Sequence, residues 1–113
     1  MQATEKQEYL ADVLASIFPD KVCYYDFGDE GNAPEPPYVA YLFDGSQGLN
    51  ADNRTYYRYD DYRVELYINR YDYESEMLLE LAFDEEEISY NKIDKIFLED
   101  TKLFEVIYQV TIN

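Results

Sequence analysis

The chain has 113 residues, of which 47% are hydrophobic and 14 are tyrosines, and its formal net charge is −16. This length and aromatic content suit a single folded domain with one core and exclude a disordered segment. The negative charge argues against nucleic acid and against an anionic membrane as partners, because both require clustered Lys and Arg. We expect one domain, residues 1–113, with a solvated acidic surface. The alternative is an acidic surface with a specific function, such as lining a passage or imitating DNA.

The cysteine count and the amino terminus indicate the compartment. Cys23 is the single cysteine, which excludes an internal disulfide and a secreted disulfide scaffold, so we expect a buried, small apolar role for it. The first residues are polar and lack the apolar core of a signal peptide, and no apolar run approaches the ~20 residues of a membrane span. We therefore expect a protein made and kept in the cytosol.

The first element in the chain is a predicted helix over about residues 4–18. Thr4 has the spacing of a capping box with Gln7, and Pro19 stops the helix because it forces the preceding residue out of the helical region. An apolar stripe at helical spacing consists of Leu10, Val13, Leu14 and Ile17. This stripe is expected to pack on a sheet.

Two strands and a long loop are predicted next. Residues 22–27 and 38–43 are rich in β-branched and aromatic residues, and residues 33–37 form an extended, proline-rich approach to the second strand. Residues 44–53 contain two Gly, two Asn, two Asp and a Ser, which is typical of an exposed loop. Such loops often contact partners. The candidate contact residues of this loop are Asp44, Gln47, Asn50, Asp52, Asn53 and Arg54.

A strand over residues 56–68 shows the clearest period-2 alternation in the chain. One side carries Tyr62, Val64, Leu66 and Ile68, and the other carries Asp61, Arg63, Glu65 and Tyr67. The second side is either a partly covered sheet face or a subunit interface, because Tyr and Arg are enriched where proteins meet. The candidate interface residues are Tyr57, Tyr59, Arg63, Glu65 and Tyr67.

The last third of the chain predicts a helix and two strands. Asp72 is placed to cap a helix over about residues 73–86, and Glu85–Glu87 lie near the negative end of its dipole, so we expect fraying or an early stop there. The expected core stripe of this helix is Met77, Leu78, Leu81 and Ala82. A strand over residues 88–98 has Ile93 and Ile96 as core candidates. The final strand places Phe104, Val106, Tyr108, Val110 and Ile112 on one face.

The order of these elements predicts an α+β fold. Strands joined by short turns favour a mostly antiparallel sheet of four to five strands, with the two helices packed on its one apolar face. The order of the strands within the sheet does not follow from these patterns.

The sequence offers no recognisable catalytic or metal-binding motif. It contains no histidine, which removes the commonest general base and metal ligand. Asp60 and Asp61 are adjacent on a strand and point to opposite faces, which does not suit a catalytic carboxylate pair. Asp26, Asp29 and Glu30 miss the calcium-loop spacing. We therefore expect no enzyme activity, no catalytic residues, no metal and no cofactor.

A series of motifs resembles the small neck proteins of long-tailed phages and prophages of Gram-positive bacteria, the head-tail joining and tail-terminator proteins. The likeness extends from about residue 9 to the end of the chain. The series consists of Pro36-Pro37-Tyr38-Val39-Ala40-Tyr41-Leu42, Ala51-Asp52-Asn53 followed by Tyr56, Val64-Glu65-Leu66-Tyr67, the acidic helix, and Leu103-Phe104-Glu105-Val106-Ile107-Tyr108.

The resemblance implies a structural virion protein. It implies an α+β subunit that assembles with copies of itself as a ring, with a hexamer as the expected form, between tail-tube and head-connector proteins. The protein would reside in the host bacterial cytoplasm during assembly and then in the virion neck. An acidic lumen would keep passing DNA from sticking.

Two other functional classes remain open. An acidic DNA-mimic inhibitor would present carboxylates in place of phosphates to a basic host partner. A small hydrolase with an acidic site is the third reading, and the absence of histidine makes it the least favoured.

Overall fold

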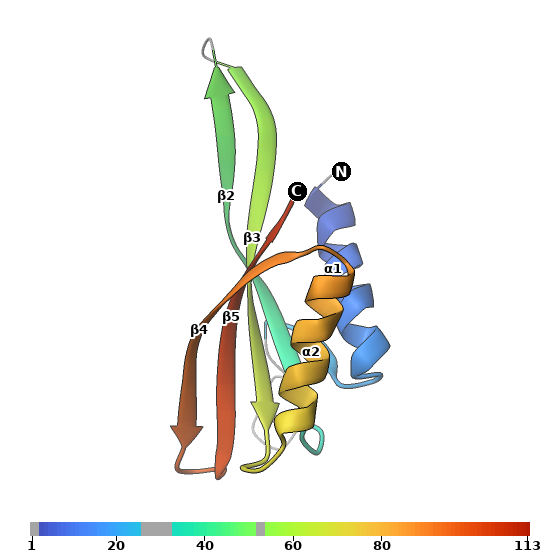
Figure 1. Ribbon diagram of the computed structural model, residues 1–113, viewed down its shortest axis with the longest axis vertical. Coiled ribbons are helices and arrows are strands. Elements are labelled where there is room, and N and C mark those ends of the chain that lie inside the picture. Colours follow the sequence, from blue (N-terminus) through green and yellow to red (C-terminus); the bar gives the residue numbers. More distant parts are fainter. Residues whose placement is uncertain (1–2, 26–32, 52–53) are drawn as a thin grey trace.

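The computed structural model describes residues 3–25, 33–51 and 54–113, and the side chains of residues 5–25, 33–46 and 59–113. A five-stranded sheet forms one layer and two helices form the other (Figure 1). In chain order the elements are α1 (Ala3–Ile17), β1 (Val22–Tyr24), β2 (Tyr38–Ala51), β3 (Arg54–Ile68), α2 (Tyr73–Glu85), β4 (Ser89–Leu98) and β5 (Leu103–Ile112).

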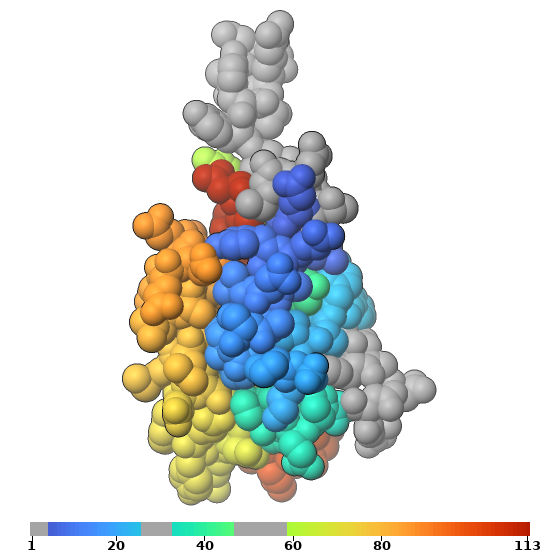
Figure 2. Space-filling model, turned by 90° about the vertical axis from the view of Figure 1, so that its right-hand side faces the viewer, coloured from blue at the N-terminus to red at the C-terminus, as the bar shows by residue number. Residues whose placement is uncertain are grey.

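The strand order in the sheet is β1-β2-β3-β5-β4. β1 runs parallel to β2, and the other three pairings are antiparallel. Both helices lie on the same face of the sheet, side by side (Figure 2), with α1 against β1 and β2 and α2 against β3 and β4. The predicted α+β class with a mostly antiparallel sheet and two helices on one face is confirmed.

The core lies between the sheet and the helices, and β3 supplies its centre. Tyr62, Val64, Leu66 and Ile68 are buried on the helix side, as the alternation predicts. The register pairs these residues with the matching face of β5, whose buried members are Val106, Tyr108, Val110 and Ile112. The opposite face of the sheet, here called the open face, has no helix on it among the described elements.

Helix α1 begins and ends close to its predicted limits. Leu10, Val13 and Leu14 are buried in the core, and Ile17 is partly buried against it. The helix ends before Pro19, as predicted, and Asp20 then takes a positive φ of 63° that turns the chain toward β1. Cys23 on β1 is half-buried, so the prediction of a buried role is only partly met.

Helix α2 has a well-formed amino-terminal cap. Ser75 donates its backbone N–H to Asp72 Oδ1 at 3.0 Å, and its hydroxyl donates to Asp72 Oδ2 at 2.7 Å. The helix ends at Glu85, and Glu87 follows with a positive φ of 56°. The early stop expected from three consecutive carboxylates at the negative end of the dipole is therefore confirmed.

Strands β2 and β3 continue well past the rest of the sheet. β3 pairs with β5 only from Asp60 onward, whereas it pairs with β2 as far as Arg54. Residues 47–51 of β2 and 54–59 of β3 therefore form a two-stranded ribbon, here called the arm, which projects about 20 Å at the usual rise per residue. Figure 1 shows the arm rising beyond the ends of both helices.

The arm corrects one sequence prediction. Residues 44–53 were expected to form a loop, but β2 continues through Ala51. A register shift between Phe43 and Gly45 leaves Asp44 as an extra residue, and Gly45 has a φ of 126°, which favours glycine. The strand therefore bends at this bulge and continues as the arm.

Candidate functional site

The open face carries a polar cluster at the end of the sheet opposite the arm. Tyr67 lies directly across from Glu105, and its hydroxyl is 2.7 Å from Glu105 Oε2 and 3.3 Å from Glu65 Oε2. Arg63 Nε lies 3.9 Å from Glu65 Oε1. The alternation of β3 places Arg63, Glu65 and Tyr67 on one face, and the register of β5 brings Glu105 to them. Two carboxyls thus share one tyrosine.

This arrangement shifts the pKa values of the Glu65 and Glu105 carboxyls in opposite directions. Burial, together with the hydrogen bond and negative charge of Glu105, raises the pKa of Glu65 to about 7. Burial alone would raise the pKa of Glu105, but hydrogen bonds from Glu65 and Tyr67 and the charge of Arg63 hold it below its ordinary value. Glu65 therefore carries the proton in the shared pair and Glu105 the charge.

Aromatic stacking extends the cluster toward β2. The rings of Tyr38 and Tyr67 stack with centroids 4.8 Å apart and an angle of 20°. Burial is the main cause that raises the pKa of the Tyr38 hydroxyl, as it does for Tyr67. At the other end of the open face Thr111 donates a hydrogen bond of 2.7 Å to Asp61 Oδ1. The open face is thus amphipathic, with tyrosine rings and internally paired charges.

The structure describes the side chains of four of the five predicted interface residues. Arg63, Glu65 and Tyr67 lie together in the cluster just described. Tyr59 lies near the base of the arm, where it lines a shallow groove with Tyr9 of α1 and Ser89 of β4. The side chain of Tyr57 lies outside the described residues.

The predicted contact loop is replaced by the arm. Asp44 is an exposed bulge residue, Gln47 and Asn50 belong to β2, and Arg54 begins β3. Asp52 and Asn53 lie outside the described residues. The loop prediction failed because the glycine and asparagine content of this segment is also compatible with a ribbon whose partner strand has high β propensity.

Helix α2 turns a different face to the core from the one predicted. Leu79 and Phe83 are buried, whereas Met77, Leu78 and Leu81 are 70%, 44% and 52% exposed. The helix carries two apolar stripes of similar period, and the sequence prediction chose the outer one; Ala82 alone of the predicted set packs against the core. The greater bulk of Phe83 is the signal that could have identified the inner stripe.

The outer stripe of α2 forms a shallow apolar groove with an acidic rim, here called the α2 groove. Its lining residues are Glu74, Met77, Leu78, Glu80, Leu81 and Asp84. Apolar side chains of this size gathered on one exposed face are typical of a surface that binds another protein. Sequence reasoning missed this surface because it assigned the same residues to the core.

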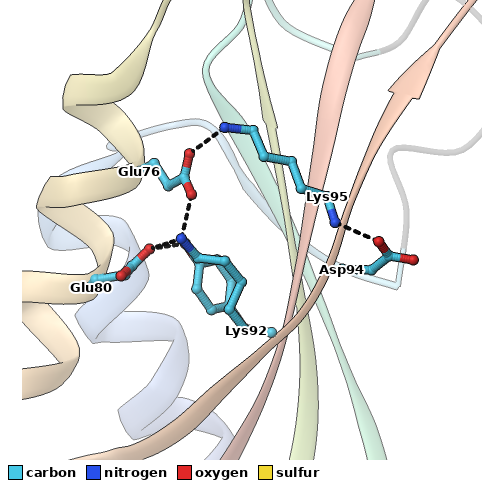
Figure 3. A network of polar contacts seen from close by, with 6 residues as sticks. Glu76, Glu80, Lys92, Asp94 and Lys95 are labelled. Atoms are coloured by element: carbon cyan, nitrogen blue, oxygen red, sulfur yellow. Dashed lines mark hydrogen bonds and ion pairs between the residues drawn. The ribbon is translucent and has the colours of Figure 1, made fainter.

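Two lysines of β4 point toward α2 and join it to the sheet (Figure 3). Lys92 forms ion pairs with Glu76 and with Glu80, the latter at 2.7 Å between Nζ and Oε2. Lys95 Nζ lies 2.8 Å from Glu76 Oε1, and its backbone N–H donates to Asp94 Oδ1. This network explains why Glu76, a charged residue, occupies a buried position on α2.

The network also determines the ionisation of its members. Burial would raise the pKa of the Glu76 carboxyl, but hydrogen bonds from Lys92 and Lys95 outweigh burial and hold the pKa below its ordinary value. Tyr108 of β5 donates a hydrogen bond of 2.7 Å to Glu80 Oε2, and burial followed by this contact raises the pKa of Tyr108. All these groups have partners within the chain, so the network is structural.

Strand β4 forms an edge of the sheet and is mostly exposed. Ile93 and Ile96, the two core candidates of this strand, are both exposed. A register shift between Lys92 and Asp94 makes Ile93 an extra residue, and this bulge interrupts the regular pairing of the edge. The prediction that these isoleucines belong to the core is wrong.

The described residues show no arrangement typical of catalysis. Asp60 faces the helices and accepts a hydrogen bond from Ser46, whereas Asp61 faces the open side, so the predicted opposite orientation is confirmed. Asp26, Asp29 and Glu30 lie outside the described residues. Within the described part of the chain, no three His, Cys, Asp or Glu side chains are grouped as metal ligands would be. Neither described helix is long and apolar enough to cross a bilayer.

The described surfaces thus include the open face, the arm and the apolar α2 groove. In comparisons with models of protein families and with curated proteins, nothing matches this chain.

Proposed function

We propose that this chain is a structural subunit of the neck of a long-tailed phage or prophage, a tail-terminator or head-tail joining protein that assembles as a ring. The ring would join tail-tube and head-connector proteins, and the subunit would pass from the host bacterial cytoplasm to the virion neck. The motif series from Pro36 to Tyr108 supports this family. The role involves binding to proteins and no chemical reaction.

The observation that carries the proposal is the α2 groove. A chain with a net charge of −16 repels its own copies, yet it exposes Met77, Leu78 and Leu81 on one helix face. Exposure of these side chains to water costs free energy that a partner recovers by covering them. A subunit that functions only in an assembly has this combination of features.

The arm supports the same proposal. An isolated two-stranded ribbon is at best marginally stable in water, and residues 47–51 and 54–59 have no third strand beside them in the described part of the chain. Contact with another protein would supply the missing support. Projections of this kind reach past the body of a subunit and can join it to a neighbour.

The acidic surface fits a passage for DNA. Like charges keep the phosphate backbone from binding to the wall of a channel. Glu86 and Glu87 are exposed directly after α2, where they line a shallow groove with Tyr59 at the base of the arm. In the proposed ring they would contribute to the negative field along the lumen.

The test is binding to purified tail tubes that lack a terminator, observed by negative-stain electron microscopy. We expect a ring-shaped density at one end of each tube. The variant Leu81→Glu should lose this density because it places a charge in the α2 groove, while Glu85→Gln, on the same helix and exposed, should retain it. Bare tube ends with the wild-type chain would contradict the proposal.

The DNA-mimic function would produce a different result. Such a protein stays monomeric and displaces DNA from a basic protein, whereas the proposed subunit should leave a DNA–protein complex intact. Carboxylates at the end of α2 favour mimicry, but the apolar groove beside them interrupts any continuous array of charges. A DNA-displacement assay run beside the tube assay distinguishes the two.

A further inference from the structure

We propose that the arm of one copy docks in the α2 groove of the next copy. This inference rests on the proposed ring-forming function and identifies the contact that would build the ring. It joins a ribbon that has no third strand beside it among the described residues to an apolar helix face that is open to water.

The composition of the two surfaces is complementary. The arm together with the two residues that connect its strands, 47–59, contains Arg54, Arg58 and the single acid Asp52, so this segment is positive in a chain that is otherwise strongly negative. It also contains Leu49, Tyr56 and Tyr57. The α2 groove has apolar walls and a rim with the exposed carboxylates of Glu74 and Asp84. A ribbon rich in Tyr and Arg matches such a groove in polarity and in charge.

The occupant must come from another copy. Figure 1 shows the arm leaving the body beyond the ends of both helices and pointing away from them, so it cannot fold back onto its own α2. Because the arm and the α2 groove are different surfaces, each copy gives one contact and receives another. Such heterologous contacts form a ring when the rotation between copies closes.

The size of the contact makes a single docking event weak. An arm about 20 Å long and two strands wide covers roughly a quarter of the ~800 Å² that each partner buries in a standard interface. Two free copies should therefore associate only weakly. Closure of a ring, or assembly on a tube end, adds contacts to a complex already formed and makes it stable.

A charge exchange tests the pairing. Arm variant Arg54→Glu/Arg58→Glu and rim variant Glu74→Lys/Asp84→Lys should each weaken self-association about tenfold or more, and their combination in one chain should restore it. Sedimentation velocity measures association up to about 1 mM, where even weak dimers of about −4 kcal/mol are detected. Lys102→Glu, a charge change in an exposed turn, should have no effect. Circular dichroism checks that each variant is folded.

Mixing two variants tests the head-to-tail geometry. A copy with Met77→Glu/Leu81→Glu retains its arm, and a copy with the arm variant retains its groove. Each alone should remain a monomer, whereas the mixture should form dimers and nothing larger. A mixture that stays monomeric overturns the proposal, as does wild-type association that neither variant weakens, or a wild-type chain that shows none at the highest concentration.

The tail-tube assay separates this inference from the proposed function. If the arm and rim variants cap tubes as well as the wild type, the arm–groove contact is wrong and the neck function stands. If arm and groove bind each other but the wild-type chain ignores tail tubes, the contact stands and the neck function is wrong.

Discussion

The Nζ atom of Lys6 on α1 lies 3.7 Å from the Oδ2 atom of Asp60 on β3, with side chains only 3% and 0% exposed. Ser46 of β2 adds a hydrogen bond, donating its hydroxyl to Asp60 Oδ1 at 2.8 Å. Asp60 is also the β3 residue nearest the arm that pairs with β5. These contacts fix α1 to the sheet at the point where the arm begins.

Removal of one charge from this buried pair should destabilise the fold. Lys6→Met leaves the buried carboxylate of Asp60 without its ammonium, so we expect a loss of about 3 kcal/mol in the free energy of unfolding, measured by urea titration. The double variant Lys6→Met/Asp60→Leu should recover most of this loss. Lys102→Met removes an exposed ion pair with Glu99 and should cost less than about 0.5 kcal/mol. Equal costs for Lys6→Met and Lys102→Met would contradict this view of the pair.

The orientation of α2 predicts opposite outcomes for two neighbouring leucines. Leu79 is fully buried, so Leu79→Ala should lower the free energy of unfolding by about 3 kcal/mol through lost burial and a cavity. Leu81 is half exposed, so Leu81→Ala should cost less than about 1 kcal/mol. Thermal and urea unfolding of both variants check this. A larger loss for Leu81→Ala would mean that the helix is rotated.

The network between α2 and β4 predicts a cost for removing one carboxylate. Glu76→Gln keeps the shape of the side chain but removes the charge shared by Lys92 and Lys95, so we expect a loss of about 1–2 kcal/mol at pH 7. Because the folded-state pKa of Glu76 is lowered, its contribution is present above the ordinary glutamate pKa and is lost as the pH falls through the folded value.

The control for the network is Glu85→Gln. Glu85 is exposed at the carboxyl end of α2, where a negative charge opposes the helix dipole, so its removal should be neutral or stabilising by a few tenths of a kcal/mol. Destabilisation by Glu85→Gln equal to that of Glu76→Gln would show that any lost carboxylate on this helix has the same effect.

The raised pKa of Glu65 on the open face predicts a pH dependence of stability that is opposite in sign to that of Glu76. The folded-state pKa of Glu65 is raised to about 7, so the folded chain binds more protons than the unfolded chain between the ordinary glutamate pKa and pH 7. The stability that this group contributes is present at low pH and is lost as the pH rises through about 7. Partial exposure to water reduces the effect, so we expect about 1–2 kcal/mol.

The measurement is the difference between the wild type and Glu65→Gln. The free energy of unfolding of the wild type should fall relative to this variant between pH 5 and pH 8, and the variant should be the more stable at pH 8. Parallel pH profiles for the two chains would show that Glu65 titrates normally. Glu99→Gln, an exposed carboxyl in a turn, should give a profile parallel to that of the wild type.

The features predicted correctly from the sequence are those in which a local pattern of side chains is compatible with only one structure. In β3 the residues from Tyr62 to Ile68 alternate between apolar and polar. Only the apolar set, Tyr62, Val64, Leu66 and Ile68, can face the core, whichever side of the sheet the helices cover. The stop of α2 near Glu85 was likewise predictable, because three consecutive carboxylates have an unfavourable position at the end of any helix.

The features that it missed depend on contacts distant in the sequence. In α2 the stripes of Leu79 and Leu81 have the same period, so apart from the bulk of Phe83 the choice between them depends on how the helix packs on the sheet. The arm was missed for a similar reason, since residues 47–51 have weak strand propensity and become a strand by pairing with β3. The open-face cluster was found only in part, because Glu105 belongs to the last strand.

The continuity of β3 through the body and the arm has a mechanical consequence. A one-residue slip of this strand would turn Tyr62 out of the core and Asp60 away from Lys6, so the core holds β3 in a fixed register where the strand enters the arm. A displacement of the arm is therefore transmitted into the core, because both belong to one continuous strand.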